Sequence, residues 1–285
     1  MKTNWIQNQD GSIYHLKLKK SQLAPIIITV GDPERVSIIA KYLDRIETEV
    51  VAREFHTITG YLGGQLMSII STGIGTDNID IVLNEIDALF NIDLQTGQPH
   101  KHPQQLKIIR LGTSGAIQRE IEIDQILITD YCIALDNTLS FYPDSNQTFK
   151  QIPSSSHTIP GLQGLHITRA DPVLLEHFNS ETVCIGNTVT AAGFYAPQGR
   201  PTRISQANLL SEIETWNIPN IGKISNIEME TSMIYGLSTL MGHQALSINA
   251  ILANRITGKF SNNPEKTIKI MIRFALEKIL SLFSQ

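Results

Sequence analysis

The stretch IIITVGDPER, residues 26–35, joins an apolar, β-branched run directly to a helix start. Residues 26–30 are typical of a buried strand, and Asp32 followed by Pro33 is typical of an N-cap with proline at the first helical position. Arg35 then falls in the first helical turn, beside backbone amides that can bind an anion. It could instead pair with a surface carboxylate. A strand that enters a helix through one glycine indicates an α/β fold.

Strand and helix patterns alternate along the rest of the chain. Apolar residues with helical spacing follow Asp77, which is expected as a cap, and also follow the Asn-Pro pair at 263–264. A further helix is expected after residues 226–230 and runs to about Met241. The other expected strands are residues 65–71, 106–111, 125–134, 165–168, 182–187 and 245–253. No repeat or linker divides the sequence, so we predict one α/β domain over residues 1–285, with a central mixed β-sheet flanked by helices.

The composition limits the classes of function. The 285 residues are 41% hydrophobic and carry a formal net charge of −4 at pH 7, which argues for a globular protein and against binding of nucleic acid. Cys132 and Cys184 have neither a disulfide framework nor a metal-binding spacing. The N-terminal residues are polar and no apolar run reaches the length of a membrane span. We therefore expect a cytoplasmic protein without membrane partners.

Two stretches are expected as surface loops, residues 96–105 and residues 143–164. The first contains His100 and His102. No third ligand or carboxylate stands close to them in the sequence, so we predict no metal site there.

An arginine closes a second apolar strand in the sequence IIRLGTSGAI, residues 108–117. A guanidinium at the end of a buried strand is costly to desolvate unless a carboxylate or phosphate binds it, so Arg110 points to an anion. We expect a Gly-Thr-Ser-Gly turn after this strand, where the glycines let backbone amides approach the same anion.

Residues 186–203, GNTVTAAGFYAPQGRPTR, combine aromatic rings, an amide and guanidinium groups in a loop-like stretch. Gln198 can donate and accept at once, which matches the amide edge of a pyrimidine, and Arg200 can donate to carbonyl oxygens. Phe194 or Tyr195 can cover a ring or a sugar face. A solvated loop is the alternative interpretation.

The acidic pair Glu228 and Glu230 flanks Met229 just before the expected helix. Acidic residues at a helix N-terminus complement the helix dipole, which is the simpler interpretation. A carboxylate there could instead accept two hydrogen bonds from a vicinal diol, with the methionine as an apolar wall under a ribose.

In combination these motifs resemble the nucleoside phosphorylases of the uridine phosphorylase type, within the purine nucleoside phosphorylase and uridine phosphorylase superfamily. The resemblance extends from about Tyr14 to the C-terminal helix. The motifs that carry it are residues 14–16, 31–36, 53–55, 71–75, 110–116, 186–188, 194–200, 228–230 and 254–255.

The resemblance implies a role for each matching residue. Phosphate would be bound by Gly31, Arg35, Arg110 and Thr113, and by Arg53 from the neighbouring subunit. Ribose would be held by Met229 and Glu230, and by His15 from the neighbouring subunit. The base pocket would consist of Phe194, Gln198, Arg200 and Arg255. A site shared in this way implies a homo-oligomer, either a dimer or a hexamer built from dimers.

The resemblance also implies a reaction, the phosphorolysis of uridine to uracil and ribose 1-phosphate through an oxocarbenium-like transition state. Purine phosphorylases carry an aspartate where this chain has Asn254 and Arg255, and arginine cannot act as that acid. The residues expected to carry the catalysis are Arg110, Arg35, Gln198, Arg200 and Glu230. Phosphorolysis of a purine or modified nucleoside is the alternative, and a non-catalytic nucleoside-binding protein is the rival from another class.

No cofactor is expected beyond inorganic phosphate as co-substrate. Bacterial members of the family bind a monovalent cation between subunits through a glutamate, a backbone carbonyl and a serine. Glu54 and Ile74 match the first two, but Asn78 stands at the position of the serine, which argues against a potassium site.

Overall fold

The computed structural model describes residues 5–142, 149–153, 164–204 and 209–283. Strand β1 (Ile26–Val30) lies at the centre of the sheet, parallel to β4 (Gln65–Ser71) on one side and to β7 (Lys107–Ala116) on the other. All five residues of β1 are buried, because helices cover both faces of the sheet at this point.

Beyond β4 the sheet continues through antiparallel β3 (Phe55–Leu62) and β2 (Arg45–Ala52). Beyond β7 the order is β14 (Gln244–Asn254), β8 (Ile126–Ala134), β11 (Cys184–Thr190) and β13 (Gly222–Glu228). Shorter strands in the described ranges are β5 (Ile92–Asp93), β6 (Gln98–Pro99), β9 (Lys150–Pro153), β10 (Gly164–Arg169), β12 (Asn217–Ile218) and β15 (Lys259–Phe260).

The second half of the sheet closes on itself. β13 pairs with β11 along its length, and its Asn226 and Ile227 also pair with Ala116 and Gly115 of β7. β7, β14, β8, β11 and β13 therefore form a ring of strands in which each is hydrogen-bonded to the next.

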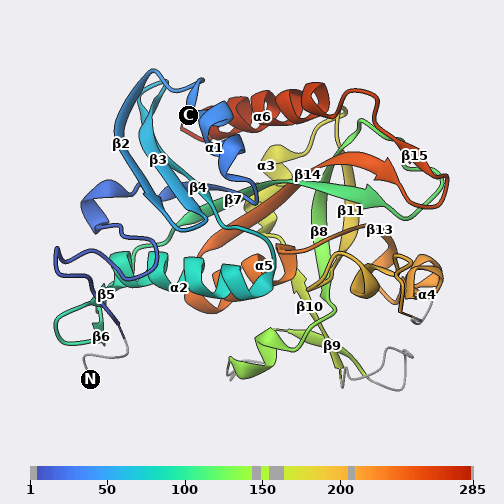
Figure 1. Ribbon diagram of the computed structural model, residues 1–285, viewed down its shortest axis with the longest axis horizontal. Helices are drawn as coiled ribbons and strands as arrows, with labels where there is room; N and C mark the ends of the chain where they lie inside the picture. The colour runs from blue at the N-terminus through green and yellow to red at the C-terminus, as the bar shows by residue number, and fades with distance from the viewer. Residues whose placement is uncertain (1–4, 143–148, 154–163, 205–208, 284–285) are drawn as a thin grey trace.

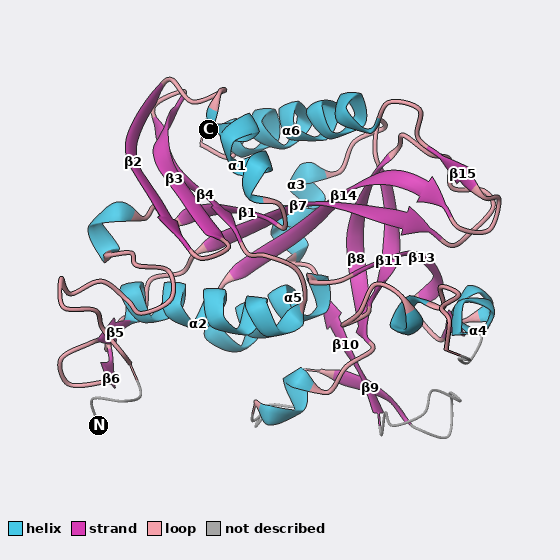
Figure 2. Cartoon of the chain, viewed as in Figure 1, coloured by secondary structure: helices cyan, strands magenta, loops and turns pink. Residues whose placement is uncertain are grey.

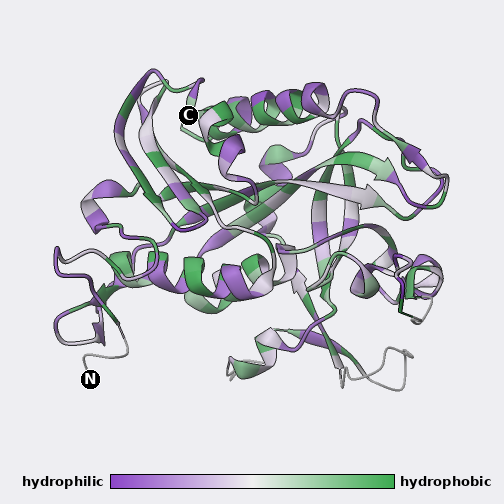
Figure 3. Cartoon of the chain, viewed as in Figure 1, coloured by the Kyte–Doolittle hydropathy of each residue, from purple (hydrophilic) through white to green (hydrophobic). Residues whose placement is uncertain are grey.

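Helices pack on both faces of the sheet (Figure 1). α1 (Pro33–Ala40), α3 (Pro172–Phe178) and α6 (Pro264–Ser281) lie on one side, and α2 (Thr76–Asn91) and α5 (Thr231–Met241) lie on the other (Figure 2). Hydrophobic and hydrophilic residues alternate along α6, as a helix with one buried face requires (Figure 3). α4 (Leu209–Thr215) packs near β13, and 3-10 turns occur at Lys20–Gln22, Thr138–Phe141 and Ala196–Gln198.

The expected fold class, α/β with a central mixed sheet flanked by helices, is confirmed. The strands at 26–30 and 65–71 have the bounds expected from the sequence. Asp32 caps α1 by accepting from the Glu34 amide, and Asn263 caps α6 by accepting from the Lys266 amide. The helix after residue 230 ends at Met241 as expected.

Two local predictions were wrong. Residues 112–115 form no turn, because β7 continues through them and pairs with β14 up to Ala116. Asp77 is not the cap of α2, which begins at Thr76 with Gly75 at the N-cap position. Gly75 has a φ of 101°, a conformation that favours glycine.

Strands β2, β3 and β13 were missed in the sequence. β2 alternates charged with apolar residues and is mostly exposed, so it lacks the apolar run that marked the other strands. Of the expected loops, residues 96–105 begin in the small β5–β6 hairpin. The prediction of a loop over 143–164 was wrong for residues 150–153, which form β9 because they pair with β10, and residues 143–148 and 154–163 lie outside the described residues. No helix in the described ranges is long and apolar enough to cross a membrane.

Candidate active site

A cavity of about 480 Å³ opens at the carboxyl ends of β1 and β7. This edge is where open α/β sheets place their binding sites, since loops and helix N-termini converge there. The cavity is lined by Gly31, Asp32, Pro33, Arg35, Ile74, Arg110, Gly112, Thr113, Ser114, Gly115, Phe194, Gln198, Arg200, Ile227, Glu228, Met229, Glu230, Leu252, Ala253 and Phe260.

Arg110 is buried on the floor of this cavity, with a relative exposure of 5%. Its Nη2 donates to Glu230 Oε2 at 2.5 Å and lies 3.0 Å from Glu228 Oε2. Its Nη1 donates to Asn249 Oδ1 at 2.9 Å. The carboxylates that a buried guanidinium requires therefore come from the start of α5, within the same chain.

The charged groups of this cluster shift the pKa values of Arg110 and Glu230. Burial favours the neutral form of Arg110, but Glu228 and Glu230 outweigh it and raise the pKa of the guanidinium. Burial also raises the pKa of Glu230, with Glu228 acting in the same direction and Arg110 opposing it. A buried carboxylate with a raised pKa beside a fixed cation is typical of a functional site.

Arg35 reaches the same end of the cavity from α1. It is 9% exposed, and its Nη1 donates to the backbone oxygen of Leu111 at 3.2 Å. Burial lowers its pKa, and Asp32 opposes the shift. Gly31 and Thr113 line the cavity beside it, so a small anion there would meet two guanidinium groups, a hydroxyl and a glycine backbone.

Gln198 lines the same cavity and is only 3% exposed. It is joined through Arg255 to the part of β7 near Gly115, beyond Arg110 and Leu111. Its backbone oxygen accepts from Arg255 Nη1 at 2.9 Å, while its side-chain amide makes no hydrogen bond within the described residues. The Arg200 guanidinium stacks on the Phe194 ring, 3.8 Å from its centroid. This end therefore presents an amide, a cation and an aromatic face close together.

Arg255 lies behind Gln198 and does not line the cavity. Burial, with the nearby charge of Arg200, lowers the pKa of Arg255 to about 10, so it is still a cation at neutral pH. The neighbouring Asn254 is buried and points into the protein. Its amide donates to the backbone oxygens of Gln118 and Ile121 and accepts from two amides of the following turn.

The structure brings together most of the predicted site residues. Those that line one cavity are Gly31, Arg35, Arg110, Thr113, Phe194, Gln198, Arg200, Met229 and Glu230. His15 and Arg53 do not line it. His15 Nδ1 lies 2.6 Å from Glu85 Oε1, and the Arg53 guanidinium lies 5.6 Å from the centre of the Tyr14 ring.

Glu228 and Glu230 have the contacts of residues at a helix start and also face the cavity. Glu228 accepts from the backbone amides of Glu230 and Thr231, as a residue at a helix start does. Glu230 Oε1 accepts from the Gly75 amide at 3.0 Å, and its other oxygen binds Arg110. Both carboxylates also line the cavity.

Sequence reasoning missed the polar residues that hold Arg110. Asn249 and Ser247 lie on β14 and face the guanidinium. Their signal is visible in hindsight, since they are polar residues inside an otherwise apolar strand. Gly112 leaves room for the guanidinium, because a Cβ there would lie 1.8 Å from Arg110 Nη1.

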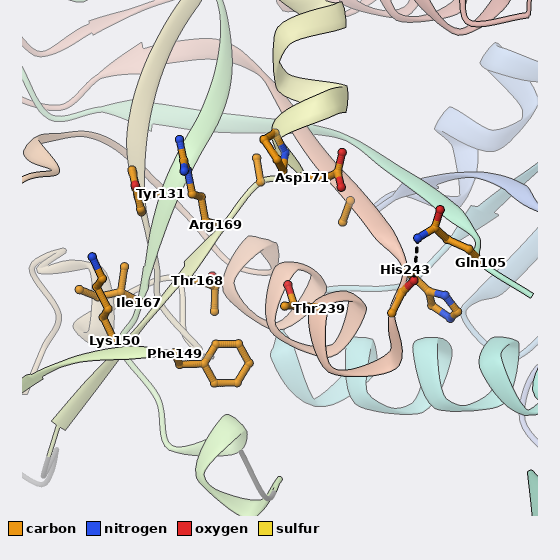
Figure 4. Close-up of a pocket in the computed structure, with 14 residues that line it drawn as sticks. Gln105, Tyr131, Phe149, Lys150, Ile167, Thr168, Arg169, Asp171, Thr239 and His243 are labelled. Atoms are coloured by element: carbon orange, nitrogen blue, oxygen red, sulfur yellow. Dashed lines mark hydrogen bonds between the residues drawn. The ribbon is translucent and has the colours of Figure 1, made fainter. Parts of the chain in front are cut away.

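A second cavity, of about 470 Å³, lies beside β10 and the end of α5 (Figure 4). Two of its ionisable side chains make structural contacts: Arg169 pairs with Asp130, and His243 Nε2 lies 3.1 Å from Asp87. Asp171 caps α3 by accepting from the Leu174 amide. No predicted site residue lies in this cavity.

The residues that correspond to a monovalent cation site in the family lie close together. Asn78 Nδ2 donates to the backbone oxygen of Ile74 at 3.4 Å. A Cβ on Gly73 would lie 2.4 Å from that nitrogen and 3.2 Å from Glu54 Cγ. An amide nitrogen thus faces the carbonyl that a cation would need. Among the described residues, no group of three His, Cys, Asp or Glu side chains could hold a metal ion.

Known proteins resemble this chain in sequence and fold. Residues 25–281 match the family model of the phosphorylase superfamily. A uridine phosphorylase of Thermococcus kodakarensis is 30% identical over 96% of this chain and 89% of its own length. A uridine phosphorylase of Haemophilus influenzae is 29% identical over 90% and 91%. A solved nucleoside phosphorylase of Trypanosoma brucei, described as showing uridine phosphorylase activity, has a TM-score of 0.83 and 29% identity over 97% of this chain and 99% of that one.

Proposed function

We propose that this chain, which belongs to the phosphorylase superfamily, cleaves uridine with inorganic phosphate to give uracil and ribose 1-phosphate. The observation that carries the proposal is one cavity lined by Arg35 and Arg110 and also by Gln198 and Arg200. Arg35 donates to Leu111 of β7, whereas Gln198 is joined through Arg255 to the region of Gly115, so the two groups lie at different ends of this strand segment. A nucleoside held between them would present its glycosidic bond to a phosphate bound by the arginines. The uridine phosphorylases of two organisms that resemble this chain over most of their length support the choice of substrate.

Phosphate is assigned to the end of the cavity that holds the arginines. Arg35 and Arg110 supply guanidinium donors, Thr113 a hydroxyl, and Gly31 a backbone that an anion can approach closely. Because the carboxylates of Glu228 and Glu230 balance these two guanidinium charges, the site is a preformed arrangement of donors with little net charge.

Ribose is assigned to the middle of the cavity. Glu230 would accept hydrogen bonds from the 2′- and 3′-hydroxyls, which a carboxylate held by Arg110 and the Gly75 amide is placed to do. Met229 supplies an apolar wall for the sugar.

The base is assigned to the end that holds Gln198. Its amide can donate to a pyrimidine carbonyl and accept from N3–H at the same time, and Arg200 can donate to a second carbonyl. Phe194 covers a ring face, and Arg255 holds the loop by donating to the Gln198 backbone. A purine phosphorylase would need an acid where Asn254 stands, and that side chain is bound to backbone groups elsewhere.

The mechanism follows from these assignments. The glycosidic bond lengthens first, and the charge that develops on the departing uracil is stabilised by Gln198 and Arg200. Phosphate, held near C1′ by Arg35 and Arg110, then captures the ribosyl cation from the opposite face. Catalysis of this kind needs positioned charges and no nucleophilic side chain.

We further propose that the site is completed by a second copy of this chain. Arg53 and His15 lie outside the cavity of their own subunit, and the family resemblance assigns them to phosphate and to ribose of the neighbouring one. A homo-oligomer, either a dimer or a hexamer of dimers, would bring them there. Three further expectations remain predictions. They are that residues 1–285 form one domain, that the protein is cytoplasmic, and that it has no cofactor or potassium site.

The proposal is tested by release of free base from uridine, thymidine, inosine and adenosine, each with and without inorganic phosphate. Release of uracil that depends on phosphate is the expected result. Release of a purine base would assign the pocket to a different nucleoside. Saturable binding of uridine without turnover would identify a binding protein instead.

A further inference from the structure

A chain of buried polar side chains follows the closed ring of strands beneath the cavity. It has members on each strand of the ring, and both of its ends line the cavity. Its members in order are Arg110 on β7, Asn249 on β14, Thr129 on β8, Thr188 on β11, Asn226 on β13 and Ser114, again on β7.

The hydrogen bonds that link these six side chains run without a break. Arg110 Nη1 lies 2.9 Å from Asn249 Oδ1, and Asn249 Nδ2 lies 3.5 Å from Thr129 Oγ1. The hydroxyls of Thr129 and Thr188 are 2.6 Å apart. Asn226 then joins Thr188, at 2.7 Å through Oδ1, to Ser114 Oγ, at 2.8 Å through Nδ2. The four members between the two ends are fully buried.

The arginine gives the chain a direction. A guanidinium can only donate, so Asn249 must present its oxygen to Arg110 and its nitrogen to Thr129. The Thr129 proton is then available for Thr188, whose own proton goes to Asn226 Oδ1. Each hydroxyl donates once, and each amide accepts on one side and donates on the other.

The last link decides what Ser114 can do. Its oxygen accepts from Asn226 Nδ2, and its proton has no acceptor among the described residues. Ser114 is half-buried, follows the proposed phosphate ligand Thr113 on β7 and lines the cavity. We propose that this directed chain makes Ser114 a hydrogen-bond donor to an acceptor oxygen of the bound nucleoside, with Asn226 as the positioning residue. The inference rests on the proposed function and adds a substrate contact to it.

The test reverses the polarity of the last link. Asn226→Asp keeps the shape of the side chain and, in its ionised form, offers only acceptors, so at a pH where the new carboxyl is ionised the Ser114 proton would turn toward it and away from the substrate. Ser114→Ala removes the donor outright. We expect each change to raise KM for uridine by about threefold to tenfold, the effect of one neutral hydrogen bond, with KM for phosphate unchanged.

The double variant distinguishes a shared contact from two separate defects. If Asn226 acts through Ser114, the double variant has the same KM for uridine as Ser114→Ala alone. Thr188→Val removes the hydroxyl that donates to Asn226 and should therefore raise KM for uridine. Thr188→Ser keeps that hydroxyl and should leave KM for uridine at the wild-type value. Thr168→Val is the matched control, because Thr168 is a buried threonine on β10 outside the chain. It should change thermal stability only.

The acceptor on the nucleoside is located by competition with free uracil. Weaker inhibition by uracil in Ser114→Ala would assign the contact to the base, and unchanged inhibition would assign it to the ribose. An unchanged KM for uridine in Ser114→Ala, with wild-type protein active, would overturn this inference alone. Absence of phosphate-dependent turnover in the wild-type protein would instead overturn the proposed function.

Discussion

Arg110 Nη2 and Glu230 Oε2 lie 2.5 Å apart, and both side chains are buried in the wall of one cavity. The arginine comes from strand β7 and the carboxylate from the N-cap residue of α5. In the proposed site, Arg110 binds phosphate and Glu230 binds ribose. Their contact therefore fixes the distance between the two groups that react.

Arg110→Ala should abolish saturation by phosphate and most of the turnover, because it removes the donor at the centre of the anion site. It also leaves two carboxylates buried without their cation, so we expect a loss of about 3–5 kcal/mol in the free energy of unfolding. Steady-state kinetics and chemical denaturation measure the two effects. Arg169→Ala is the control, since this half-exposed arginine pairs with Asp130 and should cost at most about 1 kcal/mol. Unchanged saturation by phosphate in Arg110→Ala would reject the assignment.

Gly112→Ala should weaken phosphate binding without removing a charge. The new Cβ would lie 1.8 Å from Arg110 Nη1 and 2.4 Å from its Cζ, so the guanidinium must leave its contacts with Asn249 and Glu230. We expect KM for phosphate to rise by roughly tenfold or more, about 1.4 kcal/mol per factor of ten. In Gly164→Ala the nearest atom is at 3.4 Å, so this control should behave as wild type. Equal kinetics of the two variants would contradict the prediction.

Gln198→Ala should raise KM for uridine by about tenfold and leave KM for phosphate unchanged, because the amide is assigned to the base alone. Gln105→Ala is a suitable control. Gln105 lies in the second cavity, where its amide donates to the backbone oxygen of Gly242. If Gln105→Ala, and not Gln198→Ala, impaired the reaction with uridine, the base site would have to be sought in the second cavity.

The acid limb of the pH profile should depend on Glu230. Burial raises the pKa of Glu230 above its ordinary value of 4.5, so protonation begins at a higher pH than in a free glutamate. The protonated side chain loses an acceptor for ribose, and kcat/KM for uridine should fall as the pH drops through this raised pKa. Glu230→Gln should have low activity and no such limb, whereas Glu176→Gln, on the exposed side of α3, should keep the wild-type profile.

The same shift has a consequence for stability. Between pH 4.5 and the raised pKa, the folded chain binds more protons at Glu230 than the unfolded chain does. The contribution of Glu230 to the free energy of unfolding therefore falls as the pH rises through that window. Denaturation of wild type and Glu230→Gln across this range measures the difference.

Arg53→Ala and Arg110→Ala should complement each other when the chains are mixed. If phosphate is bound by Arg110 of one subunit and Arg53 of the next, a mixed dimer contains one site with both arginines and one site with neither. Random mixing of equal amounts should restore about one quarter of the wild-type activity. Activity measured after joint refolding tests this. No recovery, with mixed dimers present, would contradict a shared site.

Much of the local structure could be predicted from the sequence. The strand at residues 26–30 and the Asp32 cap of α1 were predicted because apolar runs, caps and proline act over a few neighbouring residues. The residues that meet in the cavity were also predicted in large part, since Arg110 and Gln198 stood out by their chemistry within short motifs. The strand β2 was missed because its pairing with β3, and not its composition, makes it a strand.

The sequence by itself therefore determined the α/β fold class, the caps of α1 and α6, and the identity of most of the polar residues that line the cavity. Only the tertiary structure decided that residues 112–116 continue as a strand, that Glu228 and Glu230 both pair with Arg110, and that a series of hydrogen-bonded polar side chains joins Arg110 to Ser114. The contact between Asn226 and Ser114 depends on the closure of the strand ring between β13 and β7. The physical reason is that caps and strand patterns arise from near neighbours in the chain, whereas ion pairs and hydrogen bonds between distant strands exist only once the sheet has formed.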